Sequence, residues 1–163
     1  MEKTGGKGSK KLKRVLTAFS VFRKDICYVQ GMNFIVAQLL RHCSETFAFW
    51  LFASLIKDYE MGEVYGPMLS GLFKHSLILE TLIQAYIPDL HTRLRRFNLK
   101  ANIYASGWIF GLFASVIPND QMSTFFDNFY AHQWSFFYQL VLSLLKNHQH
   151  HIQSEEDIYD LLR

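Results

Sequence analysis

The chain has 163 residues, of which half are hydrophobic and 19% are charged, and its net charge is +3. This length and composition indicate one domain with a full hydrophobic core and exclude a largely disordered chain. The small positive charge comes without a zinc-finger or RNA-binding signature, so nucleic acid is not an expected partner. The most apolar runs, residues 47–56 and 103–117, fall short of the roughly 20 residues that a membrane-spanning helix needs.

A single all-α domain is the fold that the local sequence predicts. The chain has only three prolines and nine glycines, and apolar residues recur at helical spacing almost throughout. Residues 1–9 are expected to be a flexible N-terminal lead, and residues 10–163 to form the domain. Eight or nine helices are predicted, over residues 10–24, 32–43, 44–61, 66–86, 88–97, 104–117, 120–129, 134–146 and 154–162.

Some of these helices carry predictions about burial. Ser44 is the expected N-cap of the third helix. Residues 47–52 of that helix are all apolar, which predicts that it lies centrally and is buried on every side. In the long helix over residues 66–86, Phe73 and Tyr86 are assigned to the inward stripe.

Polar residues and prolines mark the ends of the later helices. Pro88 fits the first turn of a short helix. Asn119 or Asp120 can cap the helix over residues 120–129, and Ser154 with Asp157 indicates a capped final helix.

The expected compartment follows from what the sequence lacks. The N-terminus has no apolar segment of the kind found in signal peptides. Cys27 and Cys43 have no Cys-x-x-Cys spacing and are expected to be reduced, buried thiols. These features predict a cytoplasmic protein. The basic face of the helix over residues 10–24 is expected to be solvated, with an acidic protein surface or anionic lipid as the alternative contact.

The most informative segment is residues 28–33, Tyr-Val-Gln-Gly-Met-Asn, between a basic helix and an apolar one. Its two carboxamides, Gln30 and Asn33, flank Gly31 where a helix is about to begin. In one interpretation they cap that helix and tie the loop together. In the other, Gln30 orients a water molecule or binds a phosphoryl oxygen, since an uncharged carboxamide can both donate and accept hydrogen bonds.

This hexapeptide resembles the glutamine motif of the TBC domain family, the Rab GTPase-activating proteins, whose pattern reads Tyr-x-Gln-Gly-Met-Asn. Further segments resemble family motifs in the same order: an aromatic block at residues 46–50, a Tyr-to-Trp segment at 103–109, a Leu-Pro-like pair at 117–118 and a Trp-Asp-x-Phe-like segment at 125–129. The resemblance covers roughly residues 12–160. It implies a compact multi-helix TBC domain.

The resemblance also implies a function. Members of the family bind a GTP-loaded Rab and supply two groups in trans that promote GTP hydrolysis. By residue match, Gln30 replaces the water-positioning glutamine of the Rab, and Tyr28, Gly31 and Asn33 shape its loop. No cofactor is implied. The chain would act in vesicle trafficking, in the cytoplasm or peripherally on endomembranes through the Rab.

The second group, an arginine finger in an Ile-x-x-Asp-x-x-Arg motif, does not precede Gln30 in this sequence. Arg14 and Arg23 lie upstream but lack the motif around them. The expectation is therefore an N-terminally truncated domain without its arginine-finger portion. Two hypotheses stay open: a GTPase-activating domain whose arginine lies outside this chain, and a catalytically inactive Rab-binding or scaffold module.

A third candidate is the histidine cluster His148, His150 and His151. It lacks cysteine or carboxylate partners at ligand spacing, so it indicates a polar helix end, and no metal site is expected.

Overall fold

The computed structural model describes residues 6–154 and 156–157, and this part of the chain contains nine α-helices and no β-strand. The all-α prediction is confirmed. The helices are α1 (Lys7–Phe22), α2 (Met32–His42), α3 (Glu45–Asp58), α4 (Met61–Val64), α5 (Ser70–Tyr86), α6 (Pro88–Arg96), α7 (Ala101–Tyr104), α8 (Ser106–Gly111) and α9 (Met122–His148).

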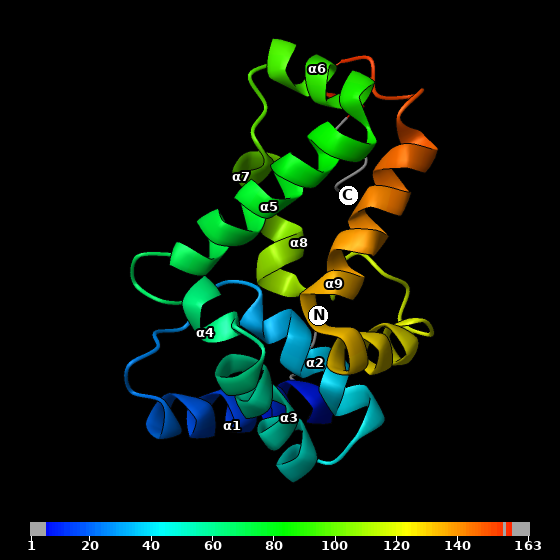
Figure 1. The fold of residues 1–163 in the computed structure, drawn as a ribbon. Coiled ribbons are helices and arrows are strands. Elements are labelled where there is room, and N and C mark those ends of the chain that lie inside the picture. The colour runs from blue at the N-terminus through cyan, green and yellow to red at the C-terminus, as the bar shows by residue number, and fades with distance from the viewer. Residues whose placement is uncertain (1–5, 155, 158–163) are drawn as a thin grey trace, which may run out of the picture.

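The helices form two groups, and both α4, which contacts α3 and α5, and α8 connect them (Figure 1). At one end α1, α2 and α3 pack against one another, and at the other end α6 lies across the end of α5. The short helix α8 contacts both α2 and α5. The segment that follows α1 and leads into α2 is thereby brought against α8.

Aromatic side chains fill much of the core. Phe52, Phe113, Phe129 and Phe137 are among the largest fully buried side chains. The ring of Phe113 lies 5.3 Å from that of Phe137 and 5.2 Å from that of Trp108. Burying a side chain of this size stabilises the fold by about 1.5–3 kcal/mol, so these rings hold segments far apart in sequence together.

A kink divides α9 at Gln133, whose φ of 55° and ψ of −142° are not helical. The predicted helices over residues 120–129 and 134–146 lie on the two sides of this kink. After it, the indole N–H of Trp134 donates to the carbonyl of Tyr59 at 2.9 Å. The sequence thus placed a helix break where the structure has a bend.

Two predicted helix starts are confirmed. The N–H of Phe47 donates to Ser44 Oγ at 3.4 Å, and Pro88 occupies the first turn of α6. At the chain end, the N–H of Ser154 donates to Asp157 Oδ2 at 2.6 Å and the N–H of Asp157 donates to Ser154 Oγ at 3.3 Å. The predicted pair is in place, although most of the predicted final helix, residues 155 and 158–162, lies outside the described residues.

The capping role of Asn119 or Asp120 is wrong. The N-cap of α9 is Gln121, and no side chain caps it. Asn119 Oδ1 instead accepts a hydrogen bond from Gln38 Nε2 at 2.8 Å, and the same amide donates to the Ala114 carbonyl. Asn119 therefore bonds the distant Gln38 instead of capping the helix that follows it.

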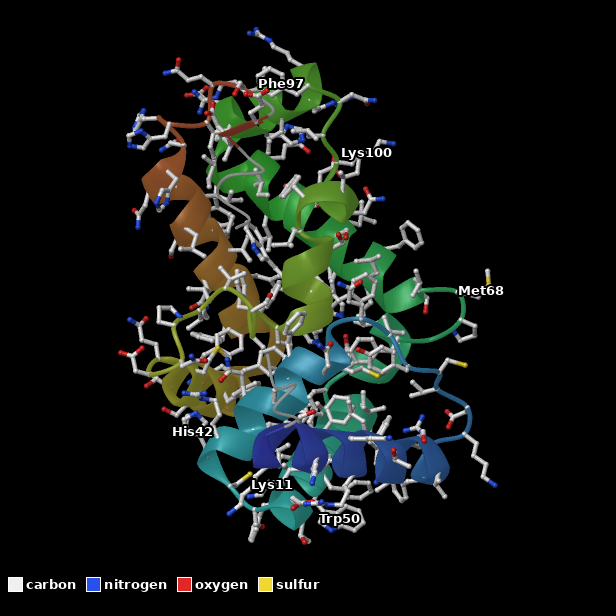
Figure 2. All side chains as sticks on the ribbon, turned by 180° about the vertical axis from the view of Figure 1, so that it is seen from behind. Lys11, His42, Trp50, Met68, Phe97 and Lys100 are labelled. Carbon is white, nitrogen blue, oxygen red and sulfur yellow. The ribbon has the colours of Figure 1, made fainter. Side chains whose placement is uncertain are left out.

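The prediction that α3 is buried on every side is also wrong. Phe47 is 68% exposed and Trp50 is 57% exposed, and Figure 2 shows Trp50 at the outer edge of the molecule. Neighbouring helices α1, α2 and α4 contact α3, and they leave this side of it open. Trp50 instead packs edge-on against Phe22 and Phe49 near the surface.

In α5, Phe73 and Tyr86 are exposed, against the prediction, whereas Leu72, Leu79 and Ile83 are buried. Phe73 follows Leu72 in the helix and so points about 100° away from it. The inward-facing stripe of α5 is therefore narrower than predicted.

Other boundaries shift by a few residues. The first helix begins at Lys7, inside the expected lead. The helix predicted over residues 104–117 ends at Gly111, because Leu112 and Phe113 adopt left-handed φ angles of 44° and 58°. Cys27 is exposed and Cys43 is half-buried, so the expectation of two buried thiols is wrong. Among the described residues, no helix is long and apolar enough to cross a membrane.

Candidate functional site

The connection between α1 and α2 presents Gln30 at the surface of the protein. Gln30 is exposed, and the next residue, Gly31, is the N-cap of α2 with a φ of +117°. Residues with a side chain rarely adopt this conformation. A Cβ on Gly31 would also lie 2.5 Å from the carbonyl oxygen of Phe110 in α8. Both the backbone angle and the close approach of α8 therefore require glycine here.

Asn33 ties the loop to the start of α2. Its Oδ1 accepts a hydrogen bond from the N–H of Gly31 at 3.2 Å. The carbonyl of Gly31 in turn accepts from the N–H groups of Phe34 and Ile35. No side chain caps α2, so neither carboxamide has the capping role, and only the loop-tying part of that interpretation holds, for Asn33.

A groove with a volume of about 380 Å³ lies between this loop and α8. Gln30 and Gly31 line one side together with Val29 and Phe34. The other side is made by residues of α8 and the turn that follows it, namely Ser106, Gly107, Phe110, Gly111 and Ser115. Gln30 thus has an exposed carboxamide at an open groove rather than a place in the core.

Glycines keep the α8 side of the groove open. Gly107 and Gly111 are four residues apart and so lie on one face of the helix. A Cβ at either position would meet nothing within 4 Å. At Gly107 and Gly111 the α8 side therefore offers backbone alone, which allows another molecule to approach closely at these two positions.

The electrostatic character of the groove is neutral. Among the described residues that line it, none is charged, and its polar side chains are those of Gln30, Ser106 and Ser115. This lining can donate and accept hydrogen bonds. It has no positive charge of its own to offset the charge of a phosphate.

The two upstream arginines are engaged elsewhere. Arg14 forms a two-pronged ion pair with Glu45, with N–O distances of 2.6 and 2.7 Å. Arg23 pairs in the same way with Asp25 at 2.7 and 2.8 Å, and this hydrogen bonding lowers the pKa of Asp25 to about 2. Neither arginine lines the groove.

Two tyrosines flank the site in different ways. Tyr28 is 61% exposed and does not belong to the groove lining. Tyr65, between α4 and α5, is buried, and its hydroxyl donates to the Phe110 carbonyl at 2.6 Å. Burial raises the pKa of Tyr65 above its ordinary value of 10, so its hydroxyl stays protonated and can donate.

The histidine cluster is remote from this groove. His148, His150 and His151 are exposed at and beyond the end of α9, and the ring of His148 bonds the carbonyl of Leu144. Within the described residues, no group of three or more histidines, cysteines or acids is placed to hold a metal ion.

The sequence alone did not assign the α8 side of the groove. Ser106 and Gly107 lie in a segment with a family resemblance, but nothing in that segment indicates that it faces Gln30. The spacing of Gly107 and Gly111 is the signal that could have marked an open helix face. Tyr65 has no local signal, because its partner Phe110 is 45 residues away.

Comparison with known proteins identifies the family. The family model described as the Rab-GTPase-TBC domain matches residues 1–153. The chain belongs to this family. A crystal structure of the Chlamydomonas flagellar RabGAP TBC domain has the same fold, with a TM-score of 0.81 at 26% identity over 98% of this chain and 53% of that one.

Curated relatives of this TBC domain include GTPase-activating proteins. The Rab GTPase-activating protein eat-17 of Caenorhabditis elegans is 33% identical over 144 residues, which cover 88% of this chain and 16% of that protein. GTPase-activating protein GYP5 of Saccharomyces cerevisiae is 33% identical over 117 residues, or 71% of this chain and 13% of that protein. TBC1 domain family member 1 of Homo sapiens is 29% identical over 153 residues, or 94% and 13%. This TBC domain thus spans less than a fifth of each of these relatives.

Proposed function

We propose that this TBC domain binds a GTP-loaded Rab and supplies Gln30 in trans to promote GTP hydrolysis. The observation that carries the proposal is the position of Gln30, exposed at a neutral groove on a loop held by Gly31 and Asn33. The family assignment supports the class of partner. In this role the chain is an activator and not the enzyme, since the Rab binds the nucleotide and hydrolyses it.

The chemistry of phosphoryl transfer suits a carboxamide. This reaction depends on positioning and on electrostatic stabilisation more than on covalent participation by the protein. The oxygen of Gln30 can accept a hydrogen bond from the attacking water while its NH₂ group donates to a phosphoryl oxygen. The tight turn at Gly31 restricts the loop, which lowers the entropy lost when Gln30 is fixed in a complex.

The proposed function does not require this chain to contact a membrane directly. Gln30 acts only when the loop at Gly31 has entered the nucleotide site of the Rab. Any association of the chain with endomembranes would therefore come through the Rab, and the chain itself would be cytoplasmic.

The positive charge that offsets the phosphate charge during GTP hydrolysis must come from outside the groove. An arginine finger accelerates GTP hydrolysis by about 10³–10⁵-fold in GTPases generally, which is roughly 4–7 kcal/mol at 1.36 kcal/mol per decade. Arg14 and Arg23 are paired with carboxylates and do not line the groove beside Gln30. We therefore expect this chain to supply only the glutamine part of the catalysis, and to stimulate hydrolysis weakly.

The same observation favours a second function. A neutral groove can bind a Rab without stabilising charge that develops during hydrolysis. In that case the domain would be a catalytically inactive Rab-binding or scaffold module. The two functions differ in one measurable respect: whether the domain prefers the transition state over the ground state of the nucleotide.

Binding to a panel of Rab proteins in two nucleotide states tests this difference. One state contains a non-hydrolysable GTP analogue, and the other contains GDP with aluminium fluoride, which imitates the transferring phosphoryl group. The proposal predicts tighter binding to the fluoride state for at least one Rab. Gln30→Ala should weaken that binding on the order of 10²-fold, the size of the loss in catalytic rate when an enzyme loses one positioned hydrogen-bonding group.

Gln139→Ala is the matched control, because Gln139 is an exposed glutamine on α9 and not part of the groove. It should bind both states like the parent chain. Equal affinity of the parent for both states, unchanged in Gln30→Ala, would replace the activating function with the scaffold one.

A further inference from the structure

The buried tyrosine Tyr65 has a role that its sequence neighbours do not suggest. We propose that Tyr65 is a positioning residue for Gln30: its hydroxyl fixes the Phe110 carbonyl, and that carbonyl is the surface on which the turn at Gly31 rests. This inference rests on the proposed function of Gln30. It adds a residue from a separate segment, between α4 and α5, to the machinery of the groove.

The first contact joins Tyr65 to α8. Tyr65 is 2% exposed, and its hydroxyl donates to the Phe110 carbonyl oxygen at 2.6 Å. The two rings also stack with planes 10° apart and centroids 6.4 Å apart. The hydroxyl and the ring therefore hold both the backbone and the side chain of Phe110.

The second contact joins α8 to the loop. The Phe110 carbonyl oxygen lies 2.5 Å from the place of a Cβ on Gly31, and its carbonyl carbon lies 2.8 Å from it. The backbone of Gly31 is thus packed directly on this carbonyl group. Because Gln30 precedes Gly31, a shift of the carbonyl is transmitted to Gln30 through one peptide bond.

The local hydrogen bonds explain why the carbonyl needs Tyr65. The last carbonyls of a helix lack partners within the helix. In the turns that follow α8, the N–H of Phe113 bonds the Trp108 carbonyl and the N–H of Ala114 bonds the Gly111 carbonyl. The Phe110 carbonyl lies between these two and accepts from Tyr65. Without that hydroxyl it would be free to tilt toward or away from Gly31.

Tyr65→Phe is the direct test, because it removes the hydroxyl and keeps the stacked ring. The matched control is Tyr130→Phe. The Tyr130 hydroxyl also donates to a backbone carbonyl, that of Leu51 at 3.0 Å, but it joins α9 to α3 away from the groove. Both variants lose one hydrogen bond of the same kind, so a general loss of stability affects them alike.

Two measurements are made on the parent chain and both variants. One is the affinity for a Rab in the aluminium fluoride state and in the GTP-analogue state. The other is the rate of hydrogen exchange at the backbone amides of residues 31–33, which needs no partner. We expect Tyr65→Phe to lose about 10- to 100-fold in affinity for the fluoride state, the effect of a displacement of about 1 Å. Its affinity for the GTP-analogue state should stay like the parent's, and exchange at residues 31–33 should become faster.

A second variant approaches the same contact from the loop. Gly31→Ala places a Cβ against the Phe110 carbonyl, and it should reproduce both effects even if Tyr65→Phe does not fold. Gly8→Ala, in the exposed first turn of α1 where a Cβ meets nothing within 4 Å, is its control and should change neither measurement.

The outcomes separate this inference from the function on which it rests. If Tyr65→Phe and Tyr130→Phe give the same affinities and the same exchange rates, Tyr65 is not a positioning residue. If the parent shows no preference for the fluoride state, the proposed function fails and so does a catalytic purpose for Tyr65. If the amides of residues 31–33 then exchange faster in Tyr65→Phe but not in Tyr130→Phe, the Tyr65 hydroxyl would still be shown to hold the loop.

Discussion

The imidazole of His75 stacks on the indole of Trp134, with ring centroids 3.5 Å apart and planes 16° apart. His75, on α5, is 1% exposed, and its Nδ1 lies 2.6 Å from the hydroxyl of Tyr138 on α9. Burial lowers the pKa of His75 to about 4; the carboxylate of Glu60, 3.5 Å from Nε2, acts in the opposite direction, and Lys74 lowers the pKa further. A neutral ring therefore joins α5 to α9 at pH 7.

Because His75 is buried and neutral, we expect the protein to lose stability in mild acid. As pH falls from 6.5 to about 4, the unfolded chain binds a proton at His75 and the folded chain does not. The free energy of unfolding therefore decreases as the pH is lowered through this window, by about 2 kcal/mol from pH 7 to pH 5. Urea unfolding at the two pH values measures it.

The control for this prediction is a second histidine. His75→Gln should remove that part of the pH dependence, whereas His132→Gln should keep it, because His132 is exposed on α9. The same slope in the parent and in His75→Gln would show that another group is responsible.

Two phenylalanines of α3 should respond in opposite ways to truncation. Phe52 is fully buried and Phe47 is 68% exposed. Phe52→Ala should lower the free energy of unfolding by about 3–5 kcal/mol, because it removes buried apolar surface and leaves a cavity. Phe47→Ala should change it by only about 0.5 kcal/mol or less. Chemical denaturation of both variants checks this, and similar losses would mean that α3 is buried all round.

The glycine side of the groove should be sensitive to bulk. Gly107→Leu places a side chain where the α8 wall is now open. We expect it to weaken binding to a Rab in the aluminium fluoride state about tenfold or more, which corresponds to roughly 1.4 kcal/mol. Stability should not fall, since leucine has the higher helix propensity.

Gly8→Leu makes the same change in the exposed first turn of α1, where an added Cβ also meets nothing within 4 Å. It should bind like the parent. If Gly107→Leu binds as tightly as Gly8→Leu, the groove beside Gln30 is not the surface that the Rab occupies.

Local sequence was sufficient for the class of fold and for several helix starts, although it did not predict the short helices α4 and α7. Apolar residues at helical period gave the helices, and Ser44 and Pro88 marked two of their starts, because a cap or a proline acts within one turn of its own position. The break near Gln133 was visible in the same way. The motif at residues 28–33 marked the loop and the exposed Gln30 within it.

The neighbours of each helix were decided only when the chain folded. The six consecutive apolar residues 47–52 do not say which side of α3 is covered, and packing left Phe47 and Trp50 exposed. Nor does any local pattern bring the Phe110 carbonyl to Gly31, or Tyr65 to that carbonyl across 45 positions. Periodicity and capping depend on residues within about one helical turn, whereas a groove depends on which surfaces meet, and that is settled by the packing of the whole core.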